Sequence, residues 1–398
     1  MILSRVRAAI SLALALGGLA VSGPVVATAA DTRPATFSNG FPTDPAFFPI
    51  GVWLQNPRLA SLYKALGFNT FVALWKGPTE AQLAQLAEHG LFAVAEPSPE
   101  AMALPHAGVV RAWMQIDEPD NAQKQPAGGY GDCLQPDELM RRYQAMRATD
   151  PSRPVFINFG QGVANPTWVG RGSTCARLDH DAYYAAAAKA GDIVSFDIYP
   201  AAEERQPHIK GRIDLVAAGI ERLRRWAAPE ARVWSFVETT HIKSPGRRPT
   251  PAEVRAEVWM AIVPGARGIV YFLHEWKPTF RDDAMFRYPE IVREVATINA
   301  MVARLAPGIN AGKPVDVRVE ATTRIATLAR EHGGALYVVV ANMERKETEA
   351  RLLVNGIEAG PVVALGEDRL VVAAGGALAD HFEPFGVHVY RIDRPARH

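Results

Sequence analysis

The sequence is short of cysteine and of net charge. Its 398 residues include only Cys133 and Cys175, and 43 basic residues almost balance 42 acidic ones. A near-neutral chain lacks the basic surface that binds nucleic acid or an anionic membrane. After the N-terminal segment, no apolar run is long enough to cross a bilayer. The sequence therefore predicts no nucleic-acid partner and no membrane attachment of the mature protein.

Common signatures of cofactor and metal sites are also missing. No Gly-x-Gly-x-x-Gly follows an early strand-like segment, and neither a phosphate-binding glycine loop nor Gly-x-Ser-x-Gly is present. His, Asp and Cys residues do not occur at spacings typical of metal ligands. We therefore expect a protein that uses neither a cofactor nor a metal ion.

The N-terminal segment has the features of a secretory signal peptide. Arg5 and Arg7 precede an apolar run over residues 8–20, and Ala27-Thr28-Ala29 gives an A-x-A cleavage pattern. The run is too short for a membrane anchor. Residues 1–30 are therefore predicted to be removed, which places the mature protein in the periplasm or outside the cell.

The next part of the chain alternates between apolar runs and segments with helical spacing. Most runs are continuously apolar, as expected for parallel strands that are buried on both faces. Eight strands alternating with helices over roughly 260 residues predict an α/β fold, a (β/α)8 barrel over residues 31–309. An open doubly wound sheet is the alternative, but it normally uses fewer strands and a glycine-rich first turn. The predicted strands are 49–54, 69–75, 91–95, 112–116, 154–159, 193–199, 233–238 and 268–273.

The character of the sequence changes after Pro307. Val315, Val317 and Val319 alternate with polar residues, which is typical of a half-buried strand. Turn dipeptides separate the later apolar runs, and no long linker precedes them. Residues 310–398 are therefore predicted to form a small all-β sandwich that packs against the barrel. Further strands are expected at 335–341, 351–354, 370–373 and 387–392.

Catalytic residues of this barrel fold lie at the C-terminal ends of the strands. The side chains predicted there are mainly aromatic, acidic or amide-bearing. Flat aromatic rings stack on the apolar faces of sugars, and carboxylates and amides hydrogen-bond to sugar hydroxyl groups. We therefore expect an oligosaccharide or polysaccharide as substrate. The residues predicted to bind it are Trp53, Trp75, Asp117, Asn158, Tyr199, His241 and Trp276.

Two glutamates stand out among the acids at these strand ends. Glu118 follows the fourth strand, and Glu238 ends the seventh. Cleavage of a sugar acetal needs one carboxyl group that protonates the leaving oxygen and a second that attacks or positions water. We therefore predict Glu118 and Glu238 as the catalytic residues. Glu96, Asp197 and Glu275 are interpreted as structural ion-pair partners, with substrate contact as the alternative.

The pattern resembles clan A of the glycoside hydrolases, which are retaining (β/α)8 enzymes. Asp117-Glu118-Pro119 is similar to the Asn-Glu-Pro motif of the clan, and Glu238 stands where the clan has its nucleophile. The resemblance implies that Glu118 is the acid/base, that Tyr199 hydrogen-bonds the nucleophile and that Trp276 floors the −1 subsite. It also implies an O-glycosyl hydrolase that cleaves a β-linked glycoside by double displacement.

One position departs from the pattern of the clan. Asp117 stands where the clan usually has the asparagine that binds the sugar 2-hydroxyl. An aspartate accepts that hydrogen bond but cannot donate one. Its charge would also raise the pKa of Glu118 if the two carboxyl groups lie close together. Asp117 therefore puts the substituent at carbon 2 of the sugar in question.

The two cysteines fall in the loops after the fourth and fifth predicted strands, on the same side of the barrel as Glu118. In an exported protein, an even cysteine count favours a disulfide between Cys133 and Cys175, with two free thiols as the alternative.

Two further functions fit the same residues. The barrel could carry out inverting hydrolysis or transglycosylation, or the protein could bind sugar without cleaving it. The presence of both glutamates favours an enzyme. The sequence specifies neither the sugar, nor the linkage, nor the oligomeric state.

Overall fold

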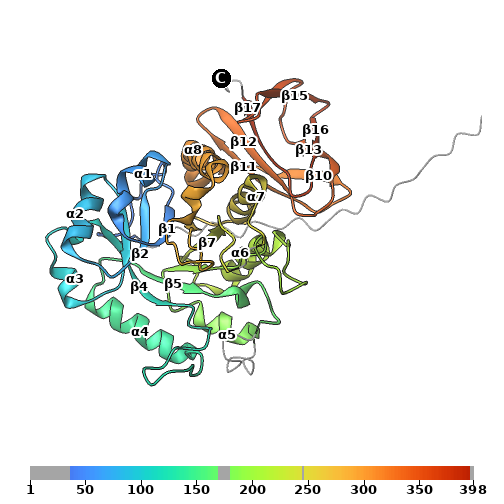
Figure 1. Cartoon of the computed structure of the whole chain (residues 1–398). Coiled ribbons are helices and arrows are strands. Elements are labelled where there is room, and N and C mark those ends of the chain that lie inside the picture. Colours follow the sequence, from blue (N-terminus) through green and yellow to red (C-terminus); the bar gives the residue numbers. More distant parts are fainter. Residues whose placement is uncertain (1–35, 169–179, 244–245, 395–398) are drawn as a thin grey trace, which may run out of the picture.

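The computed structural model describes residues 36–168, 180–243 and 246–394. The predicted signal peptide and Cys175 lie outside these residues. Two domains lie side by side, a barrel of strands ringed by helices and a domain built of strands (Figure 1). The sequence predicts this fold class correctly, an α/β barrel followed by an all-β domain.

Eight parallel strands close into a barrel in the order of the sequence, because β8 pairs with β1. Each of the eight predicted apolar runs forms one of these strands. Their side chains are buried on both faces, against the helices outside and against one another inside, which explains why the runs are continuously apolar. The strands are β1 (Ile50–Gln55), β2 (Thr70–Leu74), β3 (Phe92–Ala95), β4 (Val110–Asp117), β5 (Val155–Phe159), β6 (Ile193–Phe196), β7 (Arg232–Glu238) and β8 (Ile269–Phe272).

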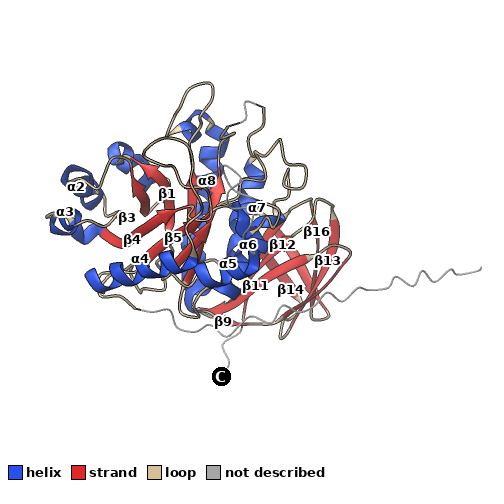
Figure 2. Cartoon of the chain, turned by 90° about the horizontal axis from the view of Figure 1, so that it is seen from below, coloured by secondary structure: helices blue, strands red, loops and turns tan. Residues whose placement is uncertain are grey.

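Helices cover the outside of the barrel (Figure 2). The last helix continues through Pro307. Within the described part of the chain, we find no helix with the length and apolar character needed to cross a membrane. The helices are α1 (Ala60–Ala65), α2 (Glu80–Glu88), α3 (Pro99–Ala103), α4 (Pro136–Thr149), α5 (His180–Ala187), α6 (Asp214–Trp226), α7 (Pro251–Ile262) and α8 (Pro289–Ala311).

Side chains from alternate positions fill the barrel interior. Val72, Met114, Phe156, Trp234 and Phe236 belong to one buried cluster there. The barrel is therefore a packed core rather than a channel. A site for a ligand has to be built from the loops at the C-terminal ends of β1–β8, which we call the barrel mouth.

A register shift in β4 redirects the residues at its end. Met114 faces the barrel interior, and the pairing of β4 with β5 shifts between Met114 and Asp117. After the shift, Ile116 packs against a cluster outside the barrel, and Asp117 pairs with Asn158 of β5. A bulge of this kind re-aims a side chain next to a functional site. Here it brings Asp117 to the inner side of the mouth, where Asn158 hydrogen-bonds to it.

The C-terminal domain is one nine-stranded sheet that curls around its own apolar core. Leu328, Val339 and Val389 of this sheet join the cluster that contains Val302 and Leu305 of α8, so the domain packs against the barrel as predicted. Its strands run in the order β10-β13-β16-β15-β14-β17-β12-β11-β9. They are β9 (Lys313–Pro314), β10 (Val317–Ala321), β11 (Ile325–His332), β12 (Ala335–Asn342), β13 (Thr348–Val354), β14 (Gly360–Ala364), β15 (Arg369–Ala374), β16 (Ala377–Phe382) and β17 (Val387–Asp393).

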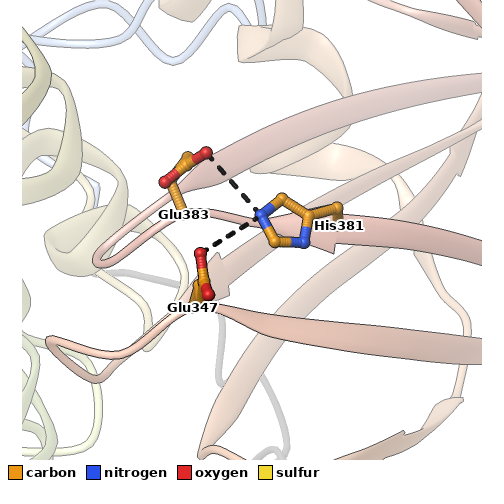
Figure 3. A group of neighbouring side chains, drawn as sticks. All are labelled: Glu347, His381 and Glu383. Carbon is orange, nitrogen blue, oxygen red and sulfur yellow. Dashed lines mark ion pairs between the residues drawn. The ribbon is translucent and has the colours of Figure 1, made fainter.

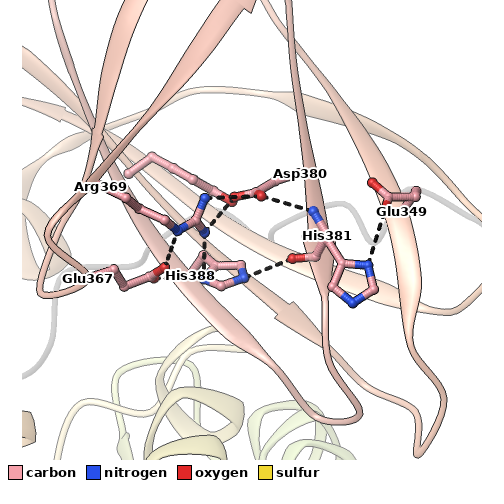
Figure 4. Close-up of polar contacts among 7 residues, drawn as sticks. Glu349, Glu367, Arg369, Asp380, His381 and His388 are labelled. Atoms are coloured by element: carbon pink, nitrogen blue, oxygen red, sulfur yellow. Dashed lines mark hydrogen bonds and ion pairs between the residues drawn. The ribbon is translucent and has the colours of Figure 1, made fainter.

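A polar network ties three strands of this sheet together (Figure 4). Arg369 of β15 donates to both carboxylate oxygens of Asp380 on β16, at 3.1 and 2.7 Å. The Tyr390 hydroxyl of β17 donates to Asp380 as well, at 2.6 Å. Glu367 pairs with Arg369 and with His388. Burial alone would raise the pKa of Asp380, but the hydrogen bonds from Arg369 and Tyr390 outweigh it and lower that pKa.

Candidate active site

Unusual backbone conformations collect at the barrel mouth. Among the residues that the structure describes, seven non-glycine residues have a positive φ, and five of them lie in or just after the C-terminal ends of barrel strands. Side chains with a Cβ adopt this region at a cost, and such residues cluster at functional sites. The five residues are Leu54, Ala73, Lys76, Glu118 and Ile242. Their positions support the barrel mouth as the candidate active site.

A cluster of carboxyl groups lies at the ends of β4, β5 and β6. The Asn158 side-chain nitrogen donates to Asp117 Oδ1 at 2.9 Å and to Asp197 Oδ1 at 3.1 Å. Because both bonds meet at one nitrogen, the two carboxylate oxygens lie at most 6.0 Å apart. Ser195 donates to Asn158 Oδ1 at 2.7 Å, which fixes the orientation of the amide. The sequence predicts Asp117 and Asn158 in this site, and it favours a structural role for Asp197, with substrate contact as the alternative.

Asp117 and Asp197 have different surroundings. Asp117 is exposed, whereas Asp197 is 8% exposed. Burial raises the pKa of Asp197 well above its ordinary value, and the nearby charges of Glu118 and Asp117 raise it further. Tyr199 is hydrogen-bonded to Asp197. Of these two carboxyl groups, Asp197 is the one whose pKa is raised by burial and by its charged neighbours.

Glu118 stands beside this pair in a fixed orientation. Its φ is 46°, its backbone N–H donates to the Asn158 carbonyl at 2.8 Å, and its Oε2 accepts from the Asn121 amide at 2.9 Å. Asp120, two residues further along the chain, is 2% exposed and accepts from the Gly160 N–H and the Tyr184 hydroxyl. Burial raises the pKa of Asp120 to about 7. Asp120 therefore supports the loop from below rather than meeting a ligand.

Glu238 lies in a different environment from the predicted one. Its side chain is 0% exposed, and its two oxygens accept the backbone N–H groups of Ala201 and Ala202 at 2.6 and 2.7 Å. Glu257 of α7, also 0% exposed, hydrogen-bonds to it. Burial raises the pKa of Glu238 to about 7 and that of Glu257 well above its ordinary value. Glu238 is therefore held by two backbone N–H groups and by Glu257, and its predicted role as nucleophile stays a prediction.

Aromatic rings extend from the acid cluster across the mouth. Tyr199 packs against Phe272, with ring centroids 4.9 Å apart, and Phe272 stacks on Trp276 at 5.6 Å. Trp75 and Trp276 are 42% and 41% exposed. Trp53, predicted with them to bind the substrate, is 7% exposed and packs on Phe236 inside the barrel.

Other predicted residues at the mouth have ordinary structural partners. His241 pairs with Glu275 at 3.2 Å, and its Nδ1 is buried without a hydrogen-bond partner in the described structure. Glu275, 1% exposed, also pairs with Arg287, as the structural interpretation expects. Lys76 and Glu96 are exposed.

One group of side chains in the described ranges has the composition of a metal site. Glu347, His381 and Glu383 lie together on the β-domain, where His381 forms ion pairs with both glutamates (Figure 3). All three residues are exposed. Hydrogen bonding to Glu349 raises the pKa of His381, and the nearby charges of Glu383 and Glu347 raise it further.

The predicted disulfide stays a prediction. Cys133 is buried in the loop after β4, and Cys175 lies outside the described residues.

No protein-family model matches the sequence, and no curated protein matches it. Solved structures do match. AmyP in complex with maltose shares 9% identity at a TM-score of 0.54, covering 89% of this chain and 98% of that one. The alpha-amylase from Geobacillus thermoleovorans, complexed with acarbose, shares 10% at 0.53, covering 91% and 100%. Alpha-galactosidase I from Mortierella vinacea shares 10% at 0.54, covering 89% and 98%. At such low identity these likenesses show a common fold.

Proposed function

We propose that the protein is an O-glycosyl hydrolase and that the carboxyl cluster at the ends of β4 and β6 cleaves the glycosidic bond. The observation that carries the proposal is the Asn158 amide, which holds Asp117 and Asp197 within 6.0 Å of each other at an open mouth lined by exposed aromatic rings. The shared fold supports it, since AmyP binds maltose and the Mortierella protein is an alpha-galactosidase.

The two aspartates take different roles. Asp197, whose pKa is raised, protonates the glycosidic oxygen as the bond to the leaving sugar breaks. Asp117, exposed and held by Asn158, attacks the anomeric carbon and forms a glycosyl-enzyme ester. Asp197, now ionised, removes a proton from water, and that water releases the sugar and restores Asp117. Glu118 contributes a charge that keeps Asp197 protonated in the free enzyme.

The separation of the aspartates is compatible with retention of anomeric configuration. Inverting enzymes keep their carboxyl groups about 6.5–9.5 Å apart to admit a water, and retaining enzymes about 5–5.5 Å apart. One oxygen of Asp117 and one oxygen of Asp197 lie at most 6.0 Å apart, which is compatible with the separation in retaining enzymes. The resemblance to clan A predicts a β-linked substrate, and paired aryl α- and β-glycosides test that prediction.

The proposed place of action is outside the cytoplasm. The Arg5, Arg7 and Ala27-Thr28-Ala29 pattern supports export, and export supports the proposed Cys133–Cys175 bridge. The bridge would join the loops after β4 and β5, which flank the acid cluster. Mass spectrometry of the exported protein identifies the point of signal-peptide cleavage. Comparison of the masses before and after reduction shows whether the protein gains the two hydrogens expected when a disulfide is reduced.

Three variants test the catalytic assignment in one experiment. Asp117→Asn and Asp197→Asn are expected to lower kcat by about a thousandfold or more on natural glycosides, at unchanged melting temperature. Glu238→Gln is expected to lower the melting temperature while the folded fraction keeps turnover. NMR of the first-formed anomer is expected to show retention.

The same set contains the result that would overturn the assignment. If Glu238→Gln abolishes turnover with an intact fold, while Asp117→Asn remains active, then the pair predicted from the sequence, Glu118 and Glu238, is the catalytic one. Absence of turnover by the wild-type protein on every glycoside, together with measurable sugar binding, would favour a non-catalytic binding protein.

A further inference from the structure

One imidazole and two carboxyl groups converge on the surface of the β-domain (Figure 3). His381 Nε2 lies 4.0 Å from Glu347 Oε2 and 3.6 Å from Glu383 Oε1. One ligand atom from each of the three residues lies within 4.8 Å of the other two. We call Glu347, His381 and Glu383 the His-Glu cluster. Spacing in the sequence does not indicate it, because β13 and β16, which bring the three residues together, are not consecutive strands.

The pairing of β13 with β16 places the cluster on one face of the sheet. Glu349 of β13 pairs directly with His381 of β16. Residues two apart along a strand share a face, so Glu347 joins Glu349 and Glu383 joins His381 on the exposed side. Glu347 and Glu383 therefore stand opposite each other across the two strands. Like charges in opposite positions are destabilising, and a cation between them would remove that cost.

Glu349 sets the orientation of the imidazole ring (Figure 4). Its Oε1 lies 3.0 Å from His381 Nδ1. Because a carboxylate only accepts hydrogen bonds, Nδ1 carries a proton, and the lone pair of the neutral ring is on Nε2. Nε2 is the atom that Glu347 and Glu383 face. A carboxylate on the far nitrogen of a histidine is the usual outer partner in metal sites, where it orients the ring and makes it a stronger ligand.

A buried amide holds the segments that carry the two glutamates. Asn342 is 0% exposed, and its side-chain nitrogen donates to the carbonyls of Lys346 and Glu383 at 2.6 and 3.0 Å. The residue before Glu347 and Glu383 itself are therefore tied to the same nitrogen. His381 lies within β16. The backbone at the three ligand positions is thus fixed before an ion binds, and only exposed side chains have to move.

We propose that the His-Glu cluster binds a divalent transition-metal ion, and that Zn²⁺ is the ion its ligands suit best. Zinc in proteins takes imidazole nitrogen and carboxylate oxygen, whereas Ca²⁺ and Mg²⁺ take oxygen ligands. Tetrahedral zinc keeps its ligand atoms about 3.4 Å apart. The observed separations of 3.6 and 4.0 Å need only small rotations of the exposed glutamate side chains. Water takes the fourth position, since all three residues are exposed.

The ion would stabilise a turn that contacts the barrel. The segment between β12 and β13 carries both Glu347 and Arg345, and the Arg345 side chain donates to the Gly211 carbonyl of the barrel at 3.0 Å. An ion shared by Glu347 and Glu383 would tie this segment to the end of β16. The site is therefore structural, and it shares no residue with the acid cluster at the barrel mouth. It does not depend on the proposed function.

Titration of the metal-free protein with zinc chloride tests the proposal. The full chain is prepared without an affinity tag, treated with EDTA and desalted, and binding is measured by isothermal calorimetry. We expect one ion per chain and a melting temperature that rises with the Zn²⁺ concentration, because the ion binds the folded state. His381→Gln and Glu347→Gln are each expected to weaken binding more than tenfold and to abolish the rise. Glu349→Ala, which leaves the three ligands in place, should weaken it about tenfold.

His106→Gln is the matched control, because His106 is an exposed histidine that is hydrogen-bonded to a single glutamate, Glu80. Its titration should coincide with that of the wild type. Circular dichroism in EDTA shows that each variant is folded, so that a lost site is not a lost fold. Failure of the wild type to bind Zn²⁺, an intact site in His381→Gln, an equal loss in His106→Gln, or Ca²⁺ binding as tight as that of Zn²⁺ would each overturn the proposal.

Discussion

Single residues decide the protonation states at this mouth. Asp117 and Asp197 share the Asn158 amide, yet one is exposed and the other is buried beside two negative charges. The sequence predicts Asp117, Asn158 and Tyr199 at the site because each ends a strand or follows one. It could not show the importance of Asp197, because that depends on a distance across three strands.

Glu118→Gln separates the two assignments of this glutamate. In our proposal its charge raises the pKa of Asp197, so the neutral variant keeps activity and the alkaline limb of its kcat/KM profile moves to lower pH. If Glu118 were the proton donor, as the resemblance implies, the variant would lose turnover of natural glycosides and keep it on substrates with good leaving groups. The measurement is a pH profile on both kinds of substrate, with Glu96→Gln as an exposed control.

The buried Glu238–Glu257 pair makes stability depend on pH. Burial raises the pKa of Glu238 to about 7, so the folded protein favours the protonated form. This contribution to stability is fully present at a pH below the ordinary pKa of a glutamate and is lost as the pH rises through about 7. Glu257→Gln keeps a donor to Glu238 and removes the second charge. We expect the melting temperature of this variant to fall less between pH 5 and pH 8 than that of the wild type.

Glu221→Gln on α6 serves as the control for this comparison, since Glu221 is only half-buried. It should follow the wild-type curve. An unchanged slope in Glu257→Gln would show that the pair does not titrate in this range.

At the scale of elements, the barrel strands follow from the sequence and several details do not. A strand buried on both faces is continuously apolar, so all eight runs could be found. The register shift in β4 could not be predicted, because nothing in the residues Ile116-Asp117 distinguishes a bulged strand from a regular one. The burial of Glu238 is likewise a tertiary effect, since the covering residues Ala201 and Ala202 follow a different strand.

In the β-domain, strands with mixed patterns escaped prediction. β11 ends in the charged segment Arg330-Glu331-His332, and β14 contains Pro361 and begins at a glycine. Both are strands because neighbouring strands pair with them rather than because of their own alternation. The hydrogen-bond network around Asp380 joins β15, β16 and β17 and helps to hold these three strands together.

Removal of Arg369 tests how much this network stabilises the sheet. Arg369→Met leaves Asp380 with the Tyr390 hydroxyl and the His381 N–H as donors and removes its cation, so the domain should lose about 1–2 kcal/mol, less than a fully buried pair because Arg369 is partly exposed. Urea unfolding measures the loss. The pair Arg351–Glu320, at 3.1 Å on the surface, is the control, and Arg351→Met should cost about 0.5 kcal/mol or less.

At the scale of the whole molecule, the β-domain packs against the barrel and shares a buried apolar cluster with it. Leu328, Leu365 and Val389 of the domain share a buried cluster with Leu305 and Ile309 of α8. Arg345 also donates to the Gly211 carbonyl in the barrel at 3.0 Å. A chain that ends after α8 would expose these apolar side chains of the helix to water.

We therefore expect a chain truncated after Ala311 to aggregate or to melt well below the full-length protein, even though every predicted catalytic residue remains. Leu328→Ala is the graded version of the same change. Leu328 is 5% exposed, so its truncation should cost about 2–4 kcal/mol, whereas Leu370→Ala, at 62% exposure, should cost little. Calorimetry of the three proteins measures this. Two separate melting transitions in the full-length protein, with the barrel transition unchanged by truncation, would mean that the domains fold independently and that the contact with α8 contributes little to the barrel.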